Sequence, residues 1–144
     1  MTLESINDKA ETARTEAASR IDRLGEIGAR RSALADEKSD LEILKTQTEE
    51  AVVTKAKELY DAALAQAREA KLAVKKYPKP PTETQLVMLK KQAVKEAGID
   101  VKIVNNASEQ RDLAREAELQ QYRITLAIAS IEYFSSLVRG FGRG

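Results

Sequence analysis

The sequence contains no histidine, no cysteine and no tryptophan among its 144 residues. Histidine is the side chain that most often acts as a general base near neutral pH, and histidine and cysteine are the usual zinc ligands. Nucleophilic arrangements that pair serine or cysteine with histidine cannot be built within such a chain. We therefore expect no enzyme active site, no metal site, no cofactor and no small-molecule substrate.

Proline and glycine, the residues that interrupt helices, are also scarce. The three prolines are Pro78, Pro80 and Pro81, and only six glycines occur in the whole chain. Alanine, the best helix former, accounts for 22 residues, but it buries little apolar area. This composition predicts an all-α fold with a thin core: an elongated helical coiled coil or hairpin that completes its core against other chains.

Turn and capping residues divide the chain into six segments. "TETQ" at residues 82–85 matches a capping box, and Gly98 and Gly140 are suited to ending helices. "NNASE" from Asn105 provides another helix start, whereas "IDVKIV" alternates apolar and polar residues like an extended segment. We expect a helical arm (1–76), a Pro-rich turn (77–81), a short helix (82–98), an extended connector (99–106), a long helix (107–139) and a Gly-Arg tail (140–144).

The arm shows heptad spacing, which is typical of helices that pack along one seam. Its first register holds Ile6, Ala10, Ala13, Ala17, Leu24 and Ile27, with Arg20 as an interruption. That register places Arg31 and Lys38 on the seam, so we expect it to fail near residue 30 and a new one to begin at Val52. Gly25 and Gly28 lie where the registers change. A break or kink there is our prediction, and a close helix crossing is the alternative.

The C-terminal helix is apolar on nearly all sides between Ile124 and Leu137, where Glu132 is the only charge. A helix packed on one partner needs a single apolar stripe, so a wider apolar surface indicates burial between several chains or entry into an apolar medium. We expect protein interfaces here and on the arm, formed by Ile124, Ile128, Ile131, Phe134, Leu137, Phe141, Leu24 and Ile27.

Alanine-rich, cysteine-free helical chains with an apolar end resemble small internal or connector proteins of tailed-phage virions, and also secretion-type stalk proteins. The resemblance is one of composition. It implies a non-enzymatic structural subunit that forms homo-oligomers or joins a hetero-assembly. The alternatives are membrane interaction through the C-terminal helix and a nucleic-acid accessory role through "RGFGRG" with Lys79, Lys90, Lys91 and Lys95.

The charge balance argues against the nucleic-acid alternative, and the N-terminal sequence bears on where the protein is located. With 24 Lys and Arg against 23 Asp and Glu, the chain lacks the basic excess of nucleic-acid-binding proteins, so nucleic acid is not an expected partner. The N-terminal sequence has no basic segment followed by an apolar one, so we expect no signal peptide. We expect a protein made in the cytoplasm that stays there or enters an assembled particle such as a virion.

Overall fold

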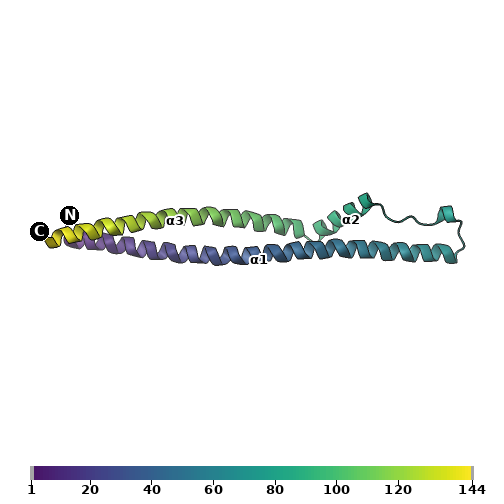
Figure 1. The fold of residues 1–144 in the computed structure, drawn as a ribbon, viewed down its shortest axis with the longest axis horizontal. Helices are drawn as coiled ribbons and strands as arrows, with labels where there is room; N and C mark the ends of the chain where they lie inside the picture. The colour runs from purple at the N-terminus through teal and green to yellow at the C-terminus, as the bar shows by residue number, and fades with distance from the viewer. Residues whose placement is uncertain (1, 144) are drawn as a thin grey trace. The chain divides into compact units, whose positions relative to one another are not determined.

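A computed structural model describes residues 2–143, and helices form nearly all of this part of the chain (Figure 1). In chain order they are α1 (Leu3–Glu69), a short 3₁₀ helix η1 (Val74–Lys76), α2 (Glu83–Glu96) and α3 (Ile99–Arg143). No strand occurs among the described residues, so the predicted all-α class is confirmed. The chain divides into two units: unit 1 comprises Met1–Ala35 and Ala107–Gly144, and unit 2 comprises Asp36–Asn106.

Helix α1 runs through Gly25 and Gly28 without interruption for 67 residues. The predicted break or kink is therefore wrong. Each glycine costs about 1 kcal/mol in a helix interior, which cooperative hydrogen bonding over the neighbouring turns offsets. Ion pairs within α1 support the helix on either side of the glycines: Glu16 pairs with Arg20 at 3.5 Å, and Glu26 pairs with Arg23 at 3.2 Å.

The C-terminal end of α1 lies earlier than the predicted residue 76. Lys71 adopts a left-handed backbone conformation with φ 53°. The amide of Lys71 donates to the carbonyl of Arg68, and the amide of Leu72 donates to that of Ala67, each at 3.1 Å. This pair of bonds is a Schellman motif, which usually has glycine at the left-handed position. Because lysine occupies that position here, the sequence carries no warning of the helix end.

Helix α2 begins as predicted, whereas α3 is longer at both ends than expected. Thr82 and Gln85 form the capping box: the hydroxyl of Thr82 accepts from the amide of Gln85, whose side chain accepts from the amide of Thr82. After α2, Gly98 adopts a left-handed backbone conformation with φ +71°, and α3 starts at the next residue. The extended connector predicted for 99–106 is thus helical, and Gly140 does not end α3, which continues to Arg143.

Periodicity explains the missed connector. The buried or half-buried residues Ile99, Ile103 and Asn106 are spaced by four and then three, which is the spacing of one helix face. The polar residues between them produce the alternation that indicates a strand over so short a window. The predicted Gly-Arg tail likewise belongs to the helix up to Arg143, and its last residue lies outside the described part.

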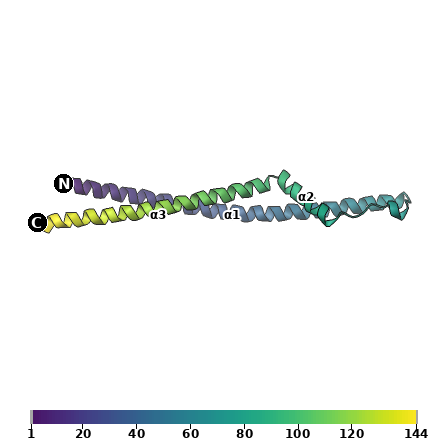
Figure 2. The same cartoon turned by 90° about the horizontal axis from the view of Figure 1, so that it is seen from above.

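In unit 1, the N-terminal part of α1 and the C-terminal part of α3 lie side by side in antiparallel orientation, with the two chain termini at the same end (Figure 1). Seen from above, the two helices cross (Figure 2). Hydrogen bonds fix the direction, since Arg20 bonds to Gln120, Arg23 to Glu116 and Arg30 to Glu109.

The inner seam of unit 1 is formed by buried and half-buried side chains that recur with heptad spacing on both helices. On α1 the heptad series of Ile6, Ala13 and Ile27 continues to the buried Leu34, so the predicted failure near residue 30 is wrong for this series. The series of Ala10, Ala17 and Leu24 does end there, since the next members, Arg31 and Lys38, are exposed. The members are Ile6, Ala10, Ala13, Ala17, Arg20, Leu24, Ile27 and Leu34 of α1, and Gln110, Leu113, Ala117, Gln120, Ile124, Ala127, Ile131, Phe134 and Val138 of α3.

Unit 2 packs α2 beside the second half of α1. Leu89 and Ala93 of α2 line a shallow apolar hollow together with Val52, Ala56 and Leu59 of α1. Val94 and Ile99 are its most deeply buried residues, and Lys45 lies 3.9 Å from the carboxylate of Asp100. The second register predicted from Val52 is confirmed in part: Val52, Ala56 and Ala63 are half-buried, whereas its other apolar members, Leu59, Ala70 and Ala73, are exposed. Burial near the end of α1 follows Tyr60 and Ala67 instead.

The two α1 glycines generate the first prediction. A Cβ built at Gly25 or Gly28 meets no atom within 4 Å, so nothing in the described chain requires glycine at either position. Gly25→Ala and Gly28→Ala should each raise the free energy of unfolding by about 1 kcal/mol, because alanine is the better helix former. Urea unfolding followed by circular dichroism measures this change.

Gly98→Ala is the matched control. At Gly98 the positive φ penalises any side chain, so that substitution should destabilise the protein by about 1 kcal/mol. If the two α1 substitutions also lower stability, the glycines serve a contact that lies outside this chain's own packing.

Candidate protein-interaction surface

Polar contacts fix the register of the two helices in unit 1. Within the inner seam, the guanidinium of Arg20 donates to the side-chain oxygen of Gln120 at 3.2 Å. Gln120 is buried, so this bond satisfies a polar group that would otherwise be costly to bury. A polar pair at a seam position specifies the alignment of helices, since a shift by one heptad would separate its members.

Two ion pairs flank the seam on one side and reinforce the same register. The Arg23 guanidinium donates twice to the carboxylate of Glu116, at 2.7 and 2.9 Å. Arg30 makes the same two-bond contact with Glu109, at 2.8 and 3.0 Å. Two parallel hydrogen bonds between a guanidinium and a carboxylate fix geometry as well as distance.

These contacts change the proton affinities of the groups involved. Hydrogen bonds from Arg30 and Arg23 hold the pKa values of Glu109 and Glu116 below the ordinary value of 4.5. Hydrogen bonding to Glu116, and to Glu26 on the same helix, raises the pKa of Arg23. All the members are partly exposed to water, so their contribution to stability is modest and mainly serves to select the register.

The opposite face of α3 carries a second apolar stripe that nothing in unit 1 covers. We call this the outer stripe. Its side chains are spaced three and four residues apart, like those of the inner seam, and lie about 160° around the helix from it. Tyr122 and Tyr133 are 64% and 59% exposed. The outer stripe consists of Leu119, Tyr122, Leu126, Ala129 and Tyr133, all exposed.

Two details extend the apolar character of this face. The hydroxyls of Thr125 and Ser130 donate to the carbonyls of Gln121 and Leu126 on the same helix, so their polar groups are satisfied locally. The ring of Tyr133 contacts that of Phe134 edge to face, with 5.3 Å between ring centres. Since Phe134 belongs to the inner seam, this contact holds one aromatic side chain of the outer stripe in place.

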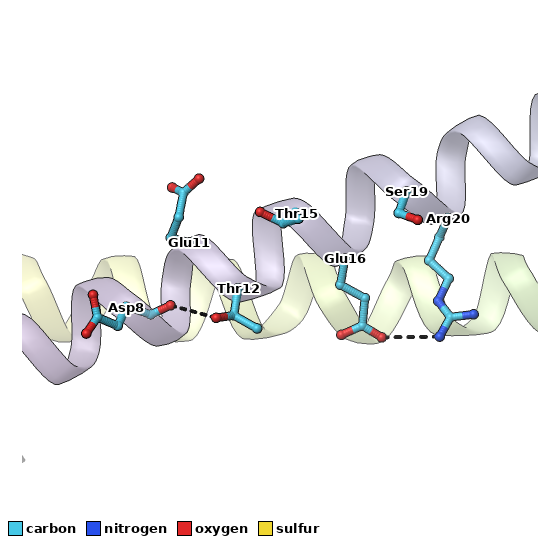
Figure 3. Close-up of a pocket in the computed structure, with 7 residues that line it drawn as sticks. All are labelled: Asp8, Glu11, Thr12, Thr15, Glu16, Ser19 and Arg20. Atoms are coloured by element: carbon cyan, nitrogen blue, oxygen red, sulfur yellow. Dashed lines mark hydrogen bonds and ion pairs between the residues drawn. The ribbon is translucent and has the colours of Figure 1, made fainter.

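The outer face of α1 is polar by comparison. A shallow hollow along this face is lined by Asp8, Glu11, Thr12, Thr15, Glu16, Ser19 and Arg20, as Figure 3 shows. Within it, the Thr12 hydroxyl donates to the carbonyl of Asp8, and Glu16 pairs with Arg20. Apart from Arg20, which also donates to Gln120 of α3, the residues that line this hollow are exposed, and the polar character of the hollow is typical of a surface in contact with water.

The structure separates the eight predicted interface residues into two groups. Ile27 is buried in the inner seam, and Leu24, Ile124, Ile131 and Phe134 are half-buried members of the same seam. Their packing within the chain accounts for their apolar character, and contact with another chain stays a prediction for all eight. Leu137 is half-buried at the edge of the seam, whereas Ile128 and Phe141 are exposed, at 45% and 52%.

Sequence reasoning missed the outer stripe, although the signal was present. In the sequence, the window from Ile124 to Leu137 is interpreted as one surface that is apolar on nearly all sides. Two interleaved heptad series, one through Gln120 and Ala127 and one through Leu119 and Leu126, describe the same residues better. The two series are hard to separate in the sequence because several inner-seam residues of α3 are polar or small, such as Gln120 and Ala127.

Other candidate sites contribute little within the described part of the chain. No group of three or more Asp and Glu side chains is placed to hold a metal ion there. The "RGFGRG" segment belongs to unit 1 and is helical as far as Arg143. Lys79, Lys91 and Lys95 are exposed residues of unit 2, and Lys90 of the same unit is half-buried. Helix α3 includes a stretch that is long and apolar enough to cross a membrane.

Comparison of the chain with models of protein families, with curated proteins and with solved structures finds no match in any of the three. The residues and their geometry therefore carry the functional argument.

The two interhelical ion pairs generate a pH prediction. Because the pKa values of Glu109 and Glu116 are lowered in the folded state, their stabilising effect is present above pH 4.5 and is lost as the pH falls through the folded-state values. We expect the melting temperature to fall on acidification below 4.5. The double variant Glu109→Gln/Glu116→Gln should show a smaller fall, measured by thermal circular dichroism across the acidic range.

Glu11→Gln is the control for this experiment, since Glu11 pairs only with Arg14 on its own helix, at 3.4 Å. That variant should retain the pH dependence of the wild type. Equal pH profiles for the wild type and the double variant would show that these pairs do not contribute to stability in solution.

Proposed function

We propose that this protein is a non-enzymatic structural subunit, a coiled-coil-like helical chain that assembles with other chains through the outer stripe of α3. The single observation that carries the proposal is the presence of two apolar stripes on one helix, of which the described part of unit 1 covers only one. An exposed stripe with heptad spacing is the surface that a further helix packs against. A component of a virion or of a secretion-type stalk is one setting for such a subunit.

Burial within the chain supports the same proposal. Five of the eleven buried apolar residues of the described chain are alanines, and the largest fully buried side chains are Ile6, Ile27, Leu34, Val94 and Ile99. Each large side chain contributes about 1.5–3 kcal/mol, and an alanine much less. Association through the outer stripe would add apolar burial that the chain alone does not supply.

Membrane contact is the second candidate, favoured by the length and apolar character of α3. The neighbouring helix argues against a transmembrane orientation. The antiparallel register places the apolar part of α3 beside the N-terminal part of α1, whose outer face carries Asp8, Glu11 and Glu16. Inserting α3 with its partner would take these charges into the bilayer, which is costly.

The proposal predicts that one charge on the outer stripe prevents association. Light scattering across a concentration series should give a discrete oligomer for the wild type. Leu126→Glu should give a monomer, or association weakened at least tenfold, because a carboxylate would be buried without a partner. Leu126 is exposed within the chain, so the variant should keep its helical content by circular dichroism.

Thr15→Glu, on the polar outer face of α1, is the matched control and should leave the mass unchanged. A wild-type monomer at every concentration would contradict self-assembly through this stripe. Flotation of the wild type with neutral liposomes, unaffected by salt, would support the membrane candidate instead.

A further inference from the structure

We infer that the occupant of the outer stripe is the outer stripe of a second copy, with the two α3 helices side by side and parallel. This inference rests on the proposed function and specifies its partner and its orientation. Three features of the described chain support it: the spacing of the stripe, the charges that flank it, and the way in which α1 already holds α3 in helical form.

The spacing suits a like-with-like pairing of two parallel helices. Leu119, Leu126 and Tyr133 repeat every seven residues, and Tyr122 and Ala129 repeat between them. In a parallel pair each position meets its own counterpart, giving two leucine layers, two tyrosine layers and one alanine layer. In an antiparallel pair the two series alternate across the interface, so that a leucine faces an alanine or a tyrosine.

The flanking charges select the parallel orientation. Glu118 immediately precedes the Leu119 series, and Arg123 immediately follows the Tyr122 series. In a parallel helix pair, residues at these two flanking positions meet across the interface when they are five apart in sequence, as these are. In an antiparallel pair each flanking series meets itself, so Glu118 and Arg123 would not face each other.

Both charges are available for such a contact. Neither Glu118 nor Arg123 forms an ion pair or side-chain hydrogen bond within the part of the chain that the structure describes, and both are exposed. Their neighbours Glu116 and Arg23, by contrast, are paired with each other inside unit 1. The two-fold symmetry of a parallel pair would form the contact between Glu118 and Arg123 twice.

The ends of the stripe define its length. Arg115 and Asp112 occupy the preceding positions of the same series, and Ser136 and Gly140 the following ones. About fifteen residues, or roughly 22 Å of helix, therefore form the contact. A free peptide of that length would be a marginal helix, but α3 is already held by the inner seam, so association does not have to form the helix.

The absence of cysteine from the sequence allows a direct test. In Leu119→Cys, the single thiol should face its counterpart in a parallel pair, within the 4.4–6.8 Å Cα separation that a disulfide needs, and mild oxidation should link most of the protein into dimers. In an antiparallel pair the two thiols would lie many residues apart and stay unlinked. Ser19→Cys, exposed on the outer face of α1, is the control and should remain unlinked.

Charge variants at Glu118 and Arg123 provide a second test of the parallel pair. Glu118→Arg and Arg123→Glu each replace two attractions by two repulsions, so each should weaken dimerisation by roughly tenfold in sedimentation equilibrium. The double variant Glu118→Arg/Arg123→Glu restores opposite charges and should recover the wild-type affinity. Recovery of this kind is not expected if the substitutions act only on folding.

The outcomes separate this inference from the proposed function. An oligomer that Leu126→Glu dissociates, but in which Leu119→Cys does not link and the double charge variant does not recover, overturns the parallel pair and leaves the assembly role standing. A wild-type monomer at every concentration overturns the parallel pair, because it shows that the outer stripe does not bind a second copy. Linking of Leu119→Cys together with charge recovery establishes the parallel pair.

Discussion

The antiparallel register of α1 and α3 in unit 1 is the constraint from which the other features follow. Alanine at positions 10, 13 and 17 leaves little side-chain volume on this part of the seam, and the large side chains that fill it come mainly from α3. Such a seam specifies alignment weakly, because small apolar layers resemble one another. The bond between Arg20 and Gln120 supplies the missing specificity, and the pairs formed by Arg23 and Arg30 hold the same alignment at the edge. Once the register is fixed, one face of α3 is committed to α1 and the other is left to solvent or to another chain.

Much of the fold follows from local sequence, and the failures have identifiable physical causes. Proline and the "TETQ" capping box located α2 correctly because these signals act within a single turn. The end of α1 was missed because Lys71 adopts the backbone conformation that glycine normally signals. The kink at Gly25 and the connector at 99–106 were wrong for a related reason: weak helix signals over a few residues are overridden by the cooperativity of the longer helix around them.

The interaction surface was only partly predictable. The excess of apolar residues near the C-terminus indicated an apolar surface wider than one stripe, and in the structure this surface comprises the inner seam and the exposed outer stripe. Assigning residues to faces required knowing that Gln120 is a seam residue, and a polar residue at a seam position is not recognisable from one sequence. With Gln120 placed, Ile124 and Ile131 belong to the inner seam, and Leu119 and Leu126 belong to the outer stripe. The sequence thus indicated an apolar surface wider than one stripe, and the register of the two helices shows which residues lie on each face of α3.

The polar contacts between the two helices of unit 1 join residues 20–30 of α1 to residues 109–120 of α3, and in the described chain none joins α1 nearer to its N-terminus. The terminal part of the pair is therefore held by Ile6, three alanines and the side chains opposite them. Under mechanical tension the two helices would separate first at the chain ends, and the separation would stop at the polar contacts of Arg20, Arg23 and Arg30. The same distribution makes backbone amides near the ends the first to exchange with solvent. The outer stripe lies on the part of α3 that packs against this N-terminal part of α1. A subunit bound there would therefore stabilise the portion of unit 1 that opens most easily.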